Sequence, residues 1–259
     1  MKRLILPLLC LFVLASSSFA WMTLPVVGGG GGSSCPPWYA DAGVIFSWDG
    51  EHDDGHNFGC EADGTVQEAD TDDAVTTTFD SQVVVQLDNA GTPTTPERLL
   101  WNQAYADGSE AAQTICLKVY STATPTNAIP TWQAGDGNND LITNRVNNGP
   151  NIKPTFDSQS SAAVTVYDTT RNNDVWENHV FTWNNVGAAT ACSALVEPYS
   201  THDGAWTDGA AIDDTTTPFT QFIIGDYYGV LTDAGEYVYI SQVAIVTGYK
   251  FDCATLTGW

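Results

Sequence analysis

The sequence predicts an all-β protein, folded as a two-sheet antiparallel jelly-roll sandwich. Short apolar segments that alternate with a period of two recur along the chain, and no segment has the length and 3.6-residue period of an ordinary helix. Turn-forming Gly, Pro, Asn and Asp residues separate these segments. Without crossover helices the strands are expected to pair antiparallel, in two sheets that cover each other's apolar faces.

Residues 1–20 have the pattern of a secretory signal peptide. Lys2 and Arg3 precede an apolar run at 4–14, and Ser18 and Ala20 provide small residues before a cleavage site after Ala20. The apolar run is too short to cross a bilayer. We therefore expect a secreted protein, extracellular or periplasmic, with no membrane insertion.

Residues 21–34 form a Gly/Ser-rich tether with five consecutive glycines at 28–32, so a single folded domain is expected over 35–259. Removal of Lys2 and Arg3 leaves six basic residues against 31 acidic ones, a net charge of −25. Such a surface excludes nucleic acid as a partner, because phosphate contacts need a basic face. It is compatible with cation binding, but the charge by itself favours the simpler interpretation of a solvated acidic surface.

Five cysteines remain after cleavage: Cys35, Cys60, Cys116, Cys192 and Cys253. Export favours disulfides, yet five cysteines cannot all pair within one chain. At least one is therefore buried and free, or bonded to another chain. If the first and last strands are neighbours, Cys35 and Cys253 are expected to form a disulfide that joins the two ends of the domain.

The first half of the domain contains four predicted strands, at 42–48, 81–87, 98–105 and 113–120. Asp107 and Gly108 suggest a hairpin that joins the last two. A helix beginning at 95–97, with Pro at its first position, is the alternative for the third segment. Residues 121–155 contain four prolines and many Asn, Asp and Gly, which indicates a long loop.

Strands are predicted again at 162–167, 179–184, 193–199 and 221–229. The last is at 235–249, with Tyr237, Tyr239, Val243 and Ile245 expected on one face. The opposite face of this last segment is also apolar, which predicts a central strand that is covered on both sides.

The segments VWENHVFTWN at 175–184, QFIIGDYYG at 221–229 and GEYVYISQVAIVTGY at 235–249 resemble strands of concanavalin A-like and laminin-G-like jelly-roll domains. The order and spacing of these segments also match that family. The resemblance implies a module that binds glycans, cleaves polysaccharides or mediates adhesion. Fold alone does not choose among these functions.

Aromatic side chains in loops are the candidates for sugar binding, because a pyranose ring stacks on an aromatic face. Trp132 and Trp206 lie in polar segments, with Tyr227 and Tyr228 as further candidates. The alternative is that both indoles pack inward to hold their loops, and that the two tyrosines belong to the sheet.

Calcium is the one cofactor that the sequence suggests. Asp136, Asn138 and Asp140 alternate as at the start of a calcium loop, although the downstream Glu is missing. The acidic loop that contains Asp49, Glu51, Asp53 and Asp54 is a second candidate.

No catalytic motif is present. The paired carboxylates of jelly-roll glucanases are missing, and the serine hydrolase, phosphate-loop and dinucleotide signatures are absent. We therefore interpret the chain as a non-catalytic module that binds carbohydrate. The alternatives are an adhesive surface protein whose partner is another protein, and then a polysaccharide-degrading enzyme.

Overall fold

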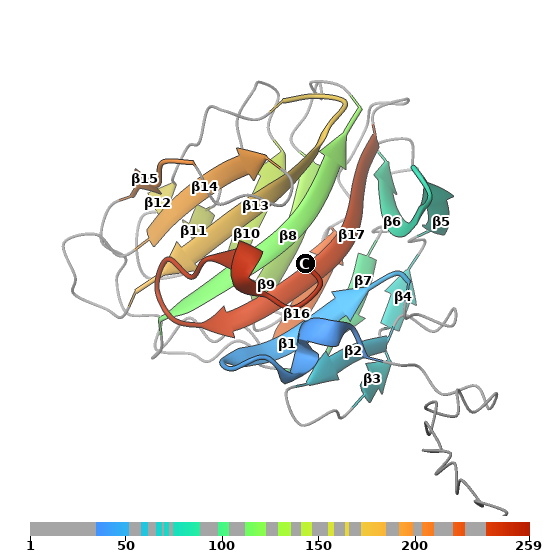
Figure 1. Ribbon diagram of the computed structural model, residues 1–259, viewed down its shortest axis with the longest axis horizontal. Helices are drawn as coiled ribbons and strands as arrows, with labels where there is room; N and C mark the ends of the chain where they lie inside the picture. Colours follow the sequence, from blue (N-terminus) through green and yellow to red (C-terminus); the bar gives the residue numbers. More distant parts are fainter. Residues whose placement is uncertain are drawn as a thin grey trace, which may run out of the picture. The chain divides into compact units, whose positions relative to one another are not determined.

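Two antiparallel sheets make up the domain in the computed structural model (Figure 1). The structure describes residues 35–51, 58–61, 66–68, 70–72, 75–88, 98–103, 112–122, 129–135, 141–146, 155–157, 164–165, 172–184, 192–198, 204–209, 220–225 and 237–259. All of them belong to one compact unit, 32–259.

The larger sheet has ten strands, and eight of them follow the order β15-β14-β13-β8-β17-β1-β2-β3, with β6 paired to β17 and β5 to β6. These strands are β1 (Val44–Asp49), β2 (Phe58–Glu61), β3 (Val66–Glu68), β5 (Val75–Phe79), β6 (Gln82–Asp88), β8 (Gln113–Ser121), β13 (Trp176–Trp183), β14 (Cys192–Pro198), β15 (Thr207–Asp208) and β17 (Tyr237–Thr247).

The smaller sheet has seven strands in the order β12-β11-β10-β9-β16-β7-β4. They are β4 (Asp70–Asp72), β7 (Arg98–Trp101), β9 (Ile129–Gly135), β10 (Leu141–Val146), β11 (Thr155–Asp157), β12 (Val164–Thr165) and β16 (Gln221–Gly225). The only helices among the described residues are two short 3₁₀ turns, η1 (Pro37–Ala40) and η2 (Cys253–Thr255). The predicted all-β two-sheet sandwich is therefore confirmed.

The core between the sheets is rich in aromatic rings. Phe46 and Trp48 of the larger sheet and Trp101, Trp132 and Phe222 of the smaller sheet are at most 1% exposed and belong to one apolar cluster. Trp101 and Phe222 both contact the ring of Phe46, with centroids 5.0 and 5.4 Å away. Rings of this size, buried from both sides, fix the two sheets face to face.

β17 is the central strand, as the sequence predicts, and it pairs with β8 on one side and with β1 and β6 on the other. A bulge between Ile240 and Gln242 shifts its register against β8. Val243 and Ile245 therefore point into the core with Val238 and Ile240, whereas Tyr239 points away. The predicted grouping of the tyrosines with Val243 and Ile245 is wrong, because one extra residue reverses the alternation.

The face of the larger sheet that points away from the smaller sheet is called the outer face below. Both terminal segments lie on it, and η1 and η2 are seen in front of the sheet in Figure 1. Trp38 and Trp259 meet edge to face at 5.4 Å, and Thr257 donates two hydrogen bonds to Asp41. A second apolar cluster forms between these segments and Cys116, Val180, Ala244 and Val246.

The disulfides connect Cys35 with Cys60 and Cys116 with Cys253, so the predicted Cys35–Cys253 bridge is wrong. The terminal segments are neighbours, as expected, but each is bonded to the strand beneath it rather than to the other segment. The cysteine that remains, Cys192, is free and buried.

Two predictions about connections are also wrong. β7 and β8 belong to different sheets, so residues 98–120 do not form a hairpin. The segment 121–155 is not one long loop, because it contains β9 and β10, which pair along their whole length. Pro130 is accommodated opposite Arg145, next to a register shift in β10.

Candidate functional site

Trp206 is the predicted sugar-binding residue that the structure places at the surface. It lies on the outer face, immediately before β15, and its partly exposed indole packs against the second apolar cluster. Two residues earlier, Gly204 lies against Leu195 of the same cluster, where a Cβ would collide with the leucine side chain. The indole is therefore anchored on one side, a requirement for a rigid stacking surface.

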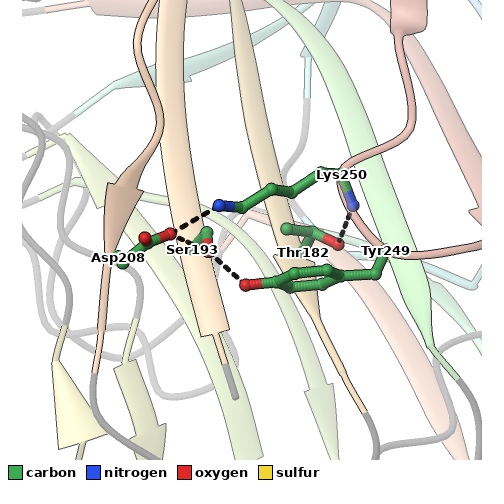
Figure 2. A network of polar contacts seen from close by, with 5 residues as sticks. All are labelled: Thr182, Ser193, Asp208, Tyr249 and Lys250. Atoms are coloured by element: carbon green, nitrogen blue, oxygen red, sulfur yellow. Dashed lines mark hydrogen bonds and ion pairs between the residues drawn. The ribbon is translucent and has the colours of Figure 1, made fainter. Parts of the chain in front are cut away.

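A polar network reaches Trp206 through Lys250, whose ammonium lies 5.7 Å from the centroid of the indole. Figure 2 shows the network itself, formed by Thr182, Ser193, Asp208, Tyr249 and Lys250. Ser193 on β14 donates a hydrogen bond of 2.8 Å to Asp208 Oδ1, and its hydroxyl lies 2.7 Å from that of Tyr249. The ammonium of Lys250 is 2.7 Å from the same Asp208 oxygen, and the backbone N–H of Lys250 donates to Thr182 Oγ1. Three strands and the segment after β17 thus bring hydroxyl, carboxylate and ammonium groups together.

The charges in this network are held in place but remain accessible. Hydrogen bonds from Lys250 and then Ser193 lower the pKa of Asp208, so this carboxylate is ionised at neutral pH. Its side chain is 51% exposed and that of Lys250 is 29% exposed. Lys250 also lies 5.7 Å from the ring centroid of Trp206 and 5.4 Å from that of Tyr249. An indole flanked by exposed hydrogen-bonding groups can orient a polyhydroxylated ligand.

The prediction that Trp132 is a sugar-binding platform is wrong. This residue lies on β9 with no exposed surface, and its ring packs against Phe181 at 5.5 Å and Phe222 at 6.3 Å. Tyr227 and Tyr228 lie outside the described residues.

The predicted calcium ligands Asp136, Asn138 and Asp140 also lie outside the described residues. In the second acidic candidate, Asp49 is buried. The negative charges of Glu51 and Asp49 both raise the pKa of the nearby Lys118 ammonium, against the effect of burial. The described ranges contain no group of three or more His, Cys, Asp or Glu side chains that could hold a metal ion.

An aromatic row on the outer face was not predicted from the sequence. It comprises Phe79, Tyr120, Trp176, Tyr237 and Tyr239, which come from β5, β8, β13 and β17. Trp176 and Tyr239 are both register partners of Tyr120, so the row crosses three neighbouring strands. The available signal was the alternation of Tyr237 and Tyr239 along β17, but Phe79 and Tyr120, which contact Tyr239, are more than 100 residues away in sequence.

His179 and Glu177 form a buried pair on the face of β13 that points into the core. His179 Nε2 lies 3.6 Å from Glu177 Oε2, and both side chains are at most 4% exposed. Asn172 donates two hydrogen bonds to the other oxygen of Glu177. This location agrees with a structural role for His179, since no large ligand can reach the pair.

Comparison with solved structures identifies proteins that share this fold. The ligand-binding domain of botulinum neurotoxin serotype D, solved with N-acetylneuraminic acid, matches 81% of this chain with a TM-score of 0.54 and 12% identity. A structure of botulinum neurotoxin type C, described as depending on two ganglioside molecules for cell entry, matches 81% with a TM-score of 0.57 and 11% identity. Trypanosoma rangeli sialidase matches 86% with a TM-score of 0.53 and 16% identity.

The chain spans about half the length of the neurotoxin structures, 48% and 49%, and about a third of the sialidase, 32%. No protein-family model matches the sequence, and no curated protein matches it. No helix among the described residues is long and apolar enough to cross a membrane. At these identities the likeness establishes the fold alone, a two-sheet β-sandwich.

Proposed function

We propose that the chain is an exported, non-catalytic, carbohydrate-binding module of the concanavalin A-like type. Three features support this proposal: the signal-peptide pattern at 1–20, the two disulfides, and a fold shared with sialic-acid-binding and ganglioside-dependent proteins.

The observation that carries the proposal is the geometry around Trp206. Its indole is anchored against the second apolar cluster and remains partly exposed, with the Lys250 ammonium 5.7 Å from its centroid. Lys250 in turn is paired with Asp208 and lies over the ring of Tyr249. A pyranose stacked on the indole would present its hydroxyls to these groups. The carboxylate accepts and the ammonium donates, so both kinds of sugar hydroxyl hydrogen bond are available.

The charge balance favours a neutral glycan. The net charge of −25 after signal removal repels anionic polysaccharides, and Lys250, the cation beside Trp206, is already paired with Asp208. Sialylated glycans are tested beside the neutral ones, because a neurotoxin domain of similar fold was solved with N-acetylneuraminic acid.

The test is binding of the chain from residue 21 onwards to an array of neutral and sialylated glycans. We expect binding to a neutral glycan that falls at least tenfold in Trp206→Ala, and less in Trp206→Phe, which keeps a ring. Trp176→Ala is the matched control, since it removes a partly exposed indole at the other end of the same face. Loss of binding in Trp176→Ala but not in Trp206→Ala would overturn the assignment of the site.

Two further conditions separate the alternatives. Repeating the array with a chelator tests the calcium prediction, because a calcium-dependent site loses its binding. A fluorogenic sialoside and a set of polysaccharides test for product release, which would replace the binding proposal with the enzyme alternative. Absence of binding across the array, together with capture of a protein partner, would favour the adhesive alternative.

A further inference from the structure

The aromatic row is at the opposite end of the outer face from Trp206. Trp176 begins β13, whereas Thr182, which contacts Lys250, is six residues further along the same strand. At about 3.3 Å per residue the two regions are about 20 Å apart. A ligand of the row is thus independent of a sugar at Trp206.

The turn between β5 and β6 folds over the sheet to complete the row. Phe79 stacks on Tyr239 with centroids 4.0 Å apart and planes 7° apart, and it meets Tyr120 edge to face at 4.7 Å. Asp80 and Ser81 both have positive φ, 48° and 65°, the backbone of a tight two-residue hairpin turn. Gly50 leaves room for this hairpin, because a Cβ there would collide with the backbone of Val83.

The rings are not a closed core. Phe79, Tyr120, Trp176 and Tyr237 all keep partly exposed surface, and Val175 beside them is 45% exposed. The ring of Trp176 is steeply inclined to those of Tyr120 and Phe79, with centroids 5.6 and 6.3 Å apart and interplanar angles of 62° and 60°, so it is not stacked in parallel on either ring.

Two carboxylates border the row. Asp80 accepts a hydrogen bond of 3.0 Å from Trp176 Nε1, and Asp174 precedes Trp176 by two residues. Burial raises the pKa of the Tyr120 phenol, and the negative charges of Asp174 and Asp80 raise it further. On the same face, Lys118 lies two residues from Tyr120 on β8, but its ammonium is buried over the ring of Trp259.

We propose that the aromatic row binds a methylated organic ammonium group. The negative faces of aromatic rings attract a cation, and the carboxylates of Asp80 and Asp174 add charge of the same sign. Partly buried rings favour a weakly hydrated cation with apolar methyl groups over a strongly hydrated primary ammonium. The net charge of the chain, −25 without the signal peptide, concentrates cations at its surface.

The direct test compares choline with 3,3-dimethylbutan-1-ol, which has the same shape without the charge, by calorimetry on the chain from residue 21 onwards. We expect choline to bind at least tenfold more tightly than the neutral alcohol, and to weaken as salt concentration rises. Equal affinity of the two compounds, or binding of neither, would overturn the proposal.

The variants assign the site. Trp176→Ala should reduce choline affinity at least tenfold, and the double change Asp80→Asn with Asp174→Asn should reduce it severalfold. Asn tolerates the positive φ of both positions, so the double variant keeps the fold while removing the charge. Trp206→Ala should leave choline binding unchanged, and unaltered affinity in both row variants would place choline elsewhere and contradict the proposal.

Two sources could present this group, a free small molecule or a lipid headgroup. Vesicles of phosphatidylcholine are therefore compared with free choline. Sedimentation with the vesicles, lost in Trp176→Ala, indicates a headgroup ligand; choline binding without sedimentation indicates a free ligand. Because glycan binding is measured with other ligands and depends on Trp206, failure of either proposal leaves the other testable.

Discussion

Among the single residues, the two tryptophans proposed from the sequence as sugar platforms have opposite environments. Trp132 has no exposed surface and contacts rings from both sheets. Trp206 packs against the second apolar cluster and is only partly buried. Trp132→Ala should destabilise the fold by about 3–5 kcal/mol, and Trp206→Ala by about 1 kcal/mol or less. Urea unfolding of both variants measures this difference, and equal losses would contradict the placement of Trp206 at the surface.

If the protein were adhesive and formed disulfides with other chains, Cys192 would be the cysteine that forms them. It is fully buried between the sheets, and burial, followed by the charge of Asp208, raises the pKa of its thiol to about 12. We expect no reaction with a thiol reagent at pH 8 until the chain is unfolded, and then one equivalent. Rapid labelling of the native protein, or disulfide-linked dimers on a non-reducing gel, would contradict this expectation.

The buried Lys118 is expected to make the free energy of unfolding increase with pH above about pH 8. Burial lowers its pKa from 10.5 to about 8, against the opposing effects of Glu51 and Asp49. Between these two values the unfolded chain holds more protons at Lys118 than the folded chain, so stability contributed by this group rises with pH across the window. Below pH 8 both states are protonated and the contribution is constant.

The prediction is measured against Lys118→Met, which cannot titrate. Between pH 7.5 and 9.5 the free energy of unfolding of the wild type should rise relative to that of the variant, by roughly 2 kcal/mol. Both proteins carry Cys192→Ala, which prevents thiol exchange in the unfolded chain. Parallel pH profiles would show that Lys118 titrates normally.

At the residue scale, the sequence could predict which residue types bind sugar but not which of them are exposed. Trp132 and Trp206 both follow small or polar residues, and only the pairing of β9 with β16 shows that Trp132 faces the core. The aromatic row could not be predicted from the sequence either. Tyr120 and Trp176 lie side by side because of the register between β8 and β13, and no local sequence motif encodes that register.

Among the elements, the segment after β17 is held to the sheet by the Cys116–Cys253 disulfide. That bridge closes a sequence separation of 137 residues, compared with 25 for Cys35–Cys60, and both of its cysteines are fully buried. The entropy of the larger loop predicts a loss of about 5 kcal/mol for the Cys116→Ala, Cys253→Ala variant, against about 3.5 for Cys35→Ala, Cys60→Ala. Urea unfolding ranks the two variants, and the reverse order would contradict this account of the C-terminal segment.

The strands predicted best are those whose two faces are both apolar or cleanly alternating, such as β1, β8, β13 and β17. Among the strands that were missed, β9 and β10 carry a proline or polar residues, and their strand character depends on pairing with each other and, for β9, with β16. The short strands β2, β3, β4, β5, β11 and β15 were missed as well. The bulge in β17 shows a related limit, since a period-two pattern contains no signal for one inserted residue.

For the whole molecule, the outer face of the larger sheet has three parts. The anchored Trp206 with its polar network lies at one end and the aromatic row at the other. Between them the terminal segments cover the sheet, and Trp259 donates a hydrogen bond to Asn178. The smaller sheet and the ring-rich core support this face, so the two ends keep fixed positions.

The most direct measurement is to follow the indole N–H signals of all the tryptophans by NMR, assigned by single Trp→Phe variants, during titration with the neutral glycan selected on the array. We predict that the Trp206 signal shifts with saturation, while those of the buried Trp48, Trp101, Trp132 and Trp183 stay in place. A saturable shift at Trp176 or at a core indole, with Trp206 unchanged, would contradict the proposed carbohydrate site.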